Sequence, residues 1–124
     1  MSRHLCIVTT LGLLLACNSA FAQETPPPAP TPGPEHARLK KLEGTWDALL
    51  HEQDGKKTKG EMTYKMECGG LWLASEFKGE HMGKPFYGKG LDSYDATKKK
   101  YNGVWVDSWM TTPLVFEGTY DDKL

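Results

Sequence analysis

A strict alternation of apolar and charged side chains between residues 59 and 68 constrains this chain most. Glycine, methionine, tyrosine, methionine and cysteine occupy the even positions from 60 to 68, whereas lysine, glutamate or threonine occupies each odd position from 59 to 67. Because successive side chains of a β-strand point to opposite faces of the sheet, this pattern predicts a strand with one buried and one solvated face. Such strands are typical of antiparallel sheets.

The Gly69-Gly70 dipeptide predicts a two-residue hairpin turn that fixes how this strand pairs with the next one. Counted outward from the turn, the predicted pairs on the apolar face are Cys68 with Leu71, Met66 with Leu73, Tyr64 with Ser75 and Met62 with Phe77. A slip of one residue would turn lysines and glutamates inward, so the sequence specifies this register.

Further short apolar runs, separated by glycine-rich or lysine-rich turns, predict a meander of strands. The predicted strands cover 45–52, 58–68, 71–79, 86–94, 101–109 and 114–120, after one short helix over 34–42. Pro34 suits the first turn of that helix and Gly44 ends it. Since no second helical period follows, a parallel βαβ architecture is disfavoured. We therefore expect an all-β chain, an antiparallel up-and-down meander with one short N-terminal helix.

The fourth and fifth predicted strands give a second register. The predicted pairs are Tyr94 with Tyr101, Gly90 with Trp105 and Gly88 with Asp107. An aromatic ring that covers a glycine stabilises a sheet, and on this parity Asp92, Trp105 and Asp107 face inward with Ser75. Glycines in strands also mark bulges, which would turn part of the strand over, so both readings stay open.

The first 22 residues have the features of an export signal. Arg3 supplies the positive start, Leu5 to Ala16 form an apolar core too short to span a bilayer, and Ala20-Phe21-Ala22 is a small-x-small cleavage site. Cleavage after Ala22 would deliver the protein to the periplasm or the extracellular space. Alternatively, Leu14-Leu15-Ala16-Cys17 resembles a lipobox, and acylation of Cys17 would anchor the protein to a membrane.

Residues 23–34 hold six of the eight prolines and predict an extended linker, which leaves 35–124 as the β domain. Removal of the signal takes Arg3 away and makes the net charge one unit more negative than the −1 of the full chain. Arg38 is then the one arginine left. Since nucleic-acid binding needs a basic surface with arginines that reach phosphates, we expect no nucleic-acid partner. No transmembrane segment is predicted in the mature chain.

Few residues suggest catalysis or metal binding. Cys68 lies in an apolar strand pattern, which favours a buried, inert thiol. The spacing of His36, His51 and His81 is unlike that of metal ligands, so we expect surface histidines, with no metal and no cofactor. In the predicted register, Asp92 and Asp107 lie roughly 13 Å apart along the strand, which is too far for a glycosidase pair. We therefore predict no catalytic residue, and an enzyme is disfavoured.

Gly44-Thr45-Trp46, directly after a short helix, resembles the G-x-W signature of lipocalin-like (calycin) barrels, a resemblance that implies that Trp46 plugs one end of the barrel. A longer series of segments resembles the bacterial family known as domain of unknown function 1579 (DUF1579), over about residues 34–121. The segments are Pro34-Glu35-His36, Leu42-Glu43-Gly44-Thr45-Trp46, Gly83-Lys84-Pro85-Phe86-Tyr87-Gly88-Lys89-Gly90, Tyr94-Asp95, Lys99-Lys100-Tyr101-Asn102-Gly103-Val104-Trp105-Val106-Asp107-Ser108 and Glu117-Gly118-Thr119-Tyr120-Asp121. This resemblance implies a lipocalin-like fold and no established activity.

The predicted number of strands is small for such a barrel. Closure takes about eight strands, whereas the sequence predicts about six. We therefore expect an incomplete barrel, truncated at its C-terminal end, with the apolar residues 114–120 left as an exposed edge.

Aromatic residues are the strongest remaining signal, since all but Phe21 lie between Trp46 and the end of the chain. They would either fill a small β core or line a cavity. The predicted cavity residues are Met62, Tyr64, Phe77, Trp105 and Phe116, with Ser75 or Asp107 as polar anchor. The function this predicts is an exported barrel that binds a small apolar or amphipathic molecule. The alternatives are a barrel enzyme that uses Asp107 and a non-catalytic interaction protein of the cell envelope; the oligomeric state is left open.

Overall fold

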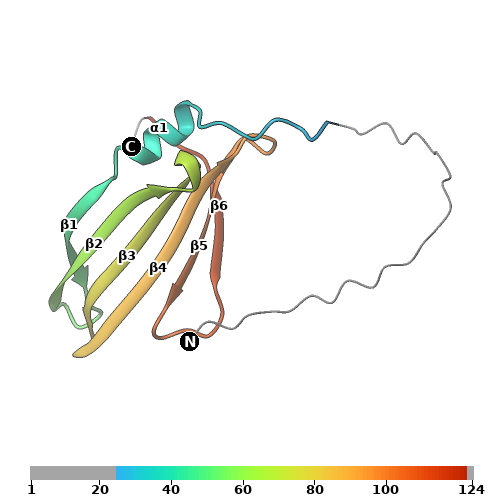
Figure 1. Ribbon diagram of the computed structural model, residues 1–124. Coiled ribbons are helices and arrows are strands. Elements are labelled where there is room, and N and C mark those ends of the chain that lie inside the picture. The colour runs from blue at the N-terminus through green and yellow to red at the C-terminus, as the bar shows by residue number, and fades with distance from the viewer. Residues whose placement is uncertain (1–24, 123–124) are drawn as a thin grey trace, which may run out of the picture.

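The computed structural model describes residues 25–122 (Figure 1). The predicted signal over 1–22, with Cys17 and Ala22, lies outside the described residues. Residues 25–32 of the proline-rich linker are exposed and have no regular secondary structure. Within the described part of the chain, no helix has the length and apolar character needed to cross a membrane.

Six strands form one antiparallel sheet in which each strand pairs with its neighbours in the sequence (Figure 1). The elements are α1 (Pro34–Lys40), β1 (Gly44–His51), β2 (Lys57–Glu67), the 3-10 turn η1 (Cys68–Gly70), β3 (Trp72–His81), β4 (Lys84–Asp95), β5 (Lys100–Asp107) and β6 (Leu114–Gly118). The predicted meander with one short helix is therefore confirmed. The helix ends two residues early, because the N–H groups of Leu42 and Glu43 bond three residues back, in a 3-10 pattern.

Both predicted registers are confirmed. In the β2–β3 hairpin, Met66 pairs with Leu73, Tyr64 with Ser75 and Met62 with Phe77. In the β4–β5 hairpin, Tyr94 pairs with Tyr101, Gly90 with Trp105 and Gly88 with Asp107. The β4–β5 pairing runs without interruption from Gly88 to Asp95, so no bulge turns the strand over.

These registers define one face of the sheet, which we call the inner face. It consists of the even-numbered residues of β1, β2, β4 and β6 and the odd-numbered residues of β3 and β5. Its most buried side chains lie on the central strand β3, where Leu73 is 1% and Phe77 3% exposed and Ser75 is also buried. The core of the sheet is therefore thin and centred on β3.

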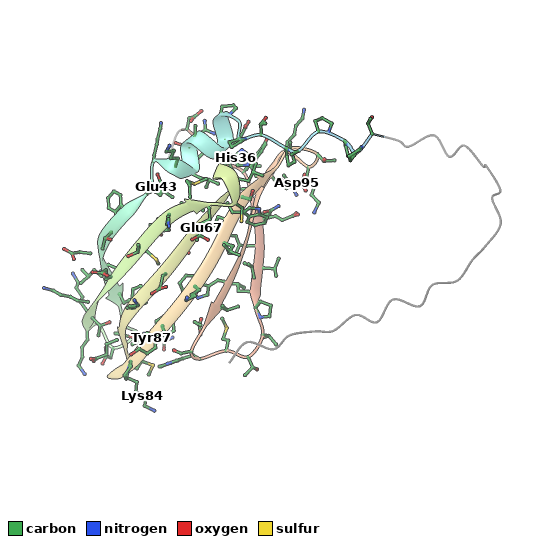
Figure 2. The ribbon with its side chains drawn as sticks, viewed as in Figure 1. His36, Glu43, Glu67, Lys84, Tyr87 and Asp95 are labelled. Carbon is green, nitrogen blue, oxygen red and sulfur yellow. The ribbon has the colours of Figure 1, made fainter. Side chains whose placement is uncertain are left out.

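The helix α1 lies across one end of the inner face (Figures 1 and 2). The ring of His36 meets that of Tyr94 edge to face, and its Nδ1 accepts a hydrogen bond from the N–H of Gly33 at 3.1 Å. Arg38 donates to the Tyr101 hydroxyl at 3.2 Å and lies over the ring of Tyr120. The prediction of a surface position for His36 is wrong, because docking of the helix buries its imidazole.

The sheet does not close into a barrel: within residues 25–122, β1 and β6 are its two edges. All of β6 is exposed, and Val115 is 69% exposed, which confirms the predicted apolar edge. Trp46 lies on the other edge strand, half exposed, and its indole N–H donates to the carbonyl of Leu42 at 2.8 Å. Its role as a plug stays a prediction.

Cys68 corrects another prediction, because its side chain is exposed. The β2–β3 pairing ends at Glu67 with Trp72, so Cys68 belongs to the turn and not to the strand. Its backbone has a φ of 50°, in the left-handed region, and its carbonyl accepts from the N–H of Leu71 at 3.4 Å. The predicted strand pair of Cys68 with Leu71 is therefore wrong: the last pair is Glu67 with Trp72, and the turn between them is longer than the predicted two residues.

Candidate functional site

The seven residues predicted to line a cavity all lie on the inner face. They are Met62 and Tyr64 on β2, Ser75 and Phe77 on β3, Trp105 and Asp107 on β5, and Phe116 on β6. One row across the sheet runs from Tyr64 through Ser75 and Gly90 to Trp105. The strand registers therefore bring the seven predicted cavity residues together on one surface.

Two of the predicted aromatic residues lie flat on the sheet over glycines. The ring of Phe77 covers Gly60 and Gly79, where a Cβ atom would overlap it. The indole of Trp105 covers Gly88 in the same way. Phe77 is almost fully buried, whereas Trp105 is partly exposed. Phe77 therefore serves mainly as core, whereas part of the Trp105 indole stays accessible on the inner face.

Asp107 is occupied by its own neighbours. Its Oδ2 accepts a hydrogen bond from the indole N–H of Trp105 at 3.0 Å, and its Oδ1 accepts one from the backbone N–H of Trp109 at 2.8 Å. Asp107 thus orients the Trp105 ring and holds the beginning of the β5–β6 loop. This arrangement suits a positioning residue better than a proton donor or a ligand anchor.

Asp92 is the inner-face carboxyl without such partners. It pairs with Leu73 on one side and Gly103 on the other, and its side chain is half-buried. Burial raises the pKa of Asp92, and burial and the Asp92 charge together raise the pKa of Tyr64. The sequence predicted that Asp92 faces inward, but its lack of hydrogen-bond partners among the described residues appears only in the structure.

A second polar group of residues lies at the end of the sheet opposite α1, around Glu52, and was missed by the sequence analysis. The Glu52 side chain is 5% exposed, and its Oε1 accepts from the Met82 backbone N–H at 3.0 Å and from the Thr58 hydroxyl at 3.1 Å. Its Oε2 lies 2.8 Å from Nδ1 of His81. Glu52 therefore ties the β1–β2 loop to the β3–β4 turn.

Hydrogen bonding dominates the electrostatics of Glu52. The Met82 N–H lowers the pKa of this carboxyl most, burial opposes that shift, and Thr58 and His81 lower the pKa further. The His81 ring packs against Trp109, with ring centres 4.7 Å apart. A hollow of about 930 Å³ lies beside these residues. No sequence pattern joined Glu52 to His81, since a loop brings them together.

The predicted surface histidines divide three ways: His51 is exposed, His81 is partly buried against Glu52, and His36 is buried. Between residues 25 and 122 there is no group of three or more histidine, cysteine, aspartate or glutamate side chains placed to hold a metal ion.

The outer face also carries apolar side chains. Ala74, Leu91, Val104 and Val106 border a shallow hollow of about 420 Å³. Charged side chains, among them Lys65 and Glu76, line the same hollow. The outer face is thus a mixed surface, unlike the aromatic inner face.

Comparison with known families places the chain. The model of a family described as "Protein of unknown function (DUF1579)" matches residues 31–124, which include every helix and strand of Figure 1. The chain belongs to the DUF1579 family. Searches of the curated proteins and of the solved structures each returned no match. The description of the DUF1579 family carries no activity.

Proposed function

We propose that this DUF1579 chain is an exported protein that binds a small apolar or amphipathic molecule on the inner face of its sheet. One observation carries the proposal: the inner face is aromatic and apolar, yet much of it stays accessible. Among residues 25–122, Leu73 and Phe77 are the large apolar side chains that the fold buries. Phe116 and Leu114, on the same face, are 44% and 56% exposed.

Accessible apolar side chains gathered on one face are characteristic of binding sites, because folded domains rarely leave a large contiguous apolar patch exposed. Ligand sites are mostly apolar and use a few polar groups to fix orientation. Here Met62, Tyr64 and Trp105 supply partly exposed apolar surface, and Ser75 and Asp92 supply the polar groups.

Export is supported by the N-terminal segment, with its positive start, apolar core and Ala20-Phe21-Ala22 site. Cleavage after Ala22 gives a periplasmic or extracellular protein, and acylation of Cys17 gives a membrane-anchored one. In both cases the binding domain operates outside the cytoplasm.

Tryptophan fluorescence tests the binding proposal. The probe is 12-bromododecanol, whose bromine quenches nearby indoles, added to the mature protein. We expect saturable quenching that falls sharply in Trp105→Phe. The matched control is Trp72→Phe, since Trp72 follows the opposite parity on β3 and faces outward; this variant should keep the quenching component that Trp105→Phe loses. Absence of quenching by brominated alcohols, amines and fatty acids alike would refute the proposal.

The exposed edge strand β6 favours the alternative of a cell-envelope interaction protein. An unpaired strand with exposed apolar side chains can add a strand from a partner. In that case Val115→Lys would abolish capture of a partner by the mature protein and would leave quenching by the probe intact.

A further inference from the structure

Asp92 occupies an unusual place at the middle of the inner face. A Cβ atom on Gly103 would overlap both the Oδ1 of Asp92 and the tip of the Phe116 ring. The carboxyl and the tip of the aromatic ring therefore both lie over Gly103. The absence of a side chain at position 103 makes the space that both groups use.

Within residues 25–122, no cationic side chain lies near the carboxyl of Asp92. Among the described strands, Lys84 is the one lysine or arginine on the inner face, and it lies at the far end of β4 (Figure 2). Eight residues of strand separate it from Asp92, a distance of roughly 27 Å. Arg38 of α1 is engaged by Tyr101 and Tyr120. No hydrogen bond to Asp92 is found between residues 25 and 122.

Two acidic side chains on the outer face, Glu76 and Glu117, have lysine partners. Glu76 lies 2.6 Å from Lys78 and 3.3 Å from Lys89. Glu117 lies 2.6 Å from Lys98 and 3.5 Å from Lys100. The fold thus supplies two lysines to each of these carboxylates and none to Asp92, although Asp92 is the more deeply placed group.

A half-buried carboxylate without a partner is costly, because it has lost water and gained no compensating charge or donor. A ligand that brought a cation would restore that interaction, and the face of a neighbouring aromatic ring would add a cation–π contribution. An anionic headgroup would be repelled at this place, and a neutral hydroxyl would gain a single hydrogen bond.

We infer, on the basis of the proposed function, that the ligand is a cationic amphiphile whose ammonium group binds Asp92 while its apolar part lies along the inner face toward Trp105. The site is formed by Asp92 and Phe116 above Gly103, with Tyr64 and Ser75 on the adjoining row.

Calorimetric titration of the mature protein with three probes that share one alkyl chain tests this inference. The probes are dodecylammonium, dodecanol and dodecanoate, each below its micelle concentration. We expect dodecylammonium to bind roughly tenfold more tightly than dodecanol, the effect of one charge-assisted hydrogen bond, and dodecanoate to bind most weakly. Equal affinity for dodecylammonium and dodecanol would overturn the inference and leave the proposed function standing, whereas no binding of any probe would refute both.

Two variants locate the preference. Asp92→Asn keeps the shape of the side chain but removes its charge. Neither probe can then form an ion pair at position 92, so the affinity for dodecylammonium should fall to within about twofold of that for dodecanol. The matched control is Asp47→Asn on β1, which changes the net charge equally on the exposed outer face and should keep the full preference. If both variants lost the preference for dodecylammonium equally, the net charge of the protein would explain the preference, and the inference would be overturned. The comparison of probes on the unaltered protein stands even if Asp92→Asn fails to fold.

Discussion

The substitution Gly88→Ala tests the packing of the inner face most sharply. A Cβ atom at position 88 would overlap the indole of Trp105 at three ring atoms, so the ring would have to leave its place. Overpacking of this kind costs about 1–3 kcal/mol. Displacement of the ring would also break the hydrogen bond from Trp105 to Asp107, worth about 1 kcal/mol. We therefore expect a loss of about 2–4 kcal/mol in the free energy of unfolding.

The chain offers a matched control in Gly118→Ala, another inner-face glycine in a strand. A Cβ atom at position 118 would meet nothing within 4 Å, and the backbone there needs no left-handed conformation. This change should be neutral, or stabilising by about 0.5 kcal/mol through the unfolded chain. Urea unfolding of the mature protein, followed by far-ultraviolet circular dichroism, measures both. Equal stability of the two variants would refute the ring-over-glycine packing and with it the placement of Trp105.

Three further predictions concern other parts of the molecule. The pKa of Glu52 is lowered in the fold, so its contribution to stability is present above the pKa of the unfolded chain and is lost as pH falls through the lower folded value. The free energy of unfolding, measured at pH 7 and between pH 5 and pH 3 (roughly the range around an ordinary glutamate pKa), should fall on the acid side. This fall should be smaller in Glu52→Gln, and an identical acid dependence of the two proteins would contradict the role of Glu52. The exposed thiol of Cys68 should react with a thiol reagent in the folded mature protein at a rate close to that in denaturant; protection until unfolding would place it in the interior. Intact mass of the protein recovered from its cell envelope should correspond to a chain that begins at Gln23, whereas a diacylglyceryl adduct on Cys17 would mean a lipoprotein.

The β2–β3 register was predictable because it rests on two local features that agree. The apolar parity of residues 59–68 and the Gly69-Gly70 turn specify the same pairing, and a slip would bury charges. For the β4–β5 hairpin the sequence left a bulge open as an alternative, and the uninterrupted pairing in the structure decides for the register that places Trp105 over glycines. Local periodicity therefore sufficed to place the predicted cavity residues of β2 and β3 on one face.

Residues at the ends of elements were harder to predict, because tertiary contacts decide them. Cys68 continues the strand parity, yet the turn takes it out of the sheet and exposes it. The burial of His36 depends on where α1 docks. Glu52 and His81 meet only because a loop folds back toward a hairpin turn. No pattern within a single segment encodes these contacts.

The central claim, that the inner face binds the ligand, is tested most directly by methyl NMR of the mature protein titrated with dodecylammonium. The methyl groups of Met62 and Met66 report on the inner face, and those of Leu91, Val104 and Val106 report on the outer face. We predict ligand-to-protein contacts and shift changes at Met62 and Met66, with the outer methyl groups unmoved. Contacts confined to Leu91, Val104 and Val106 would place the ligand in the outer hollow and contradict the account.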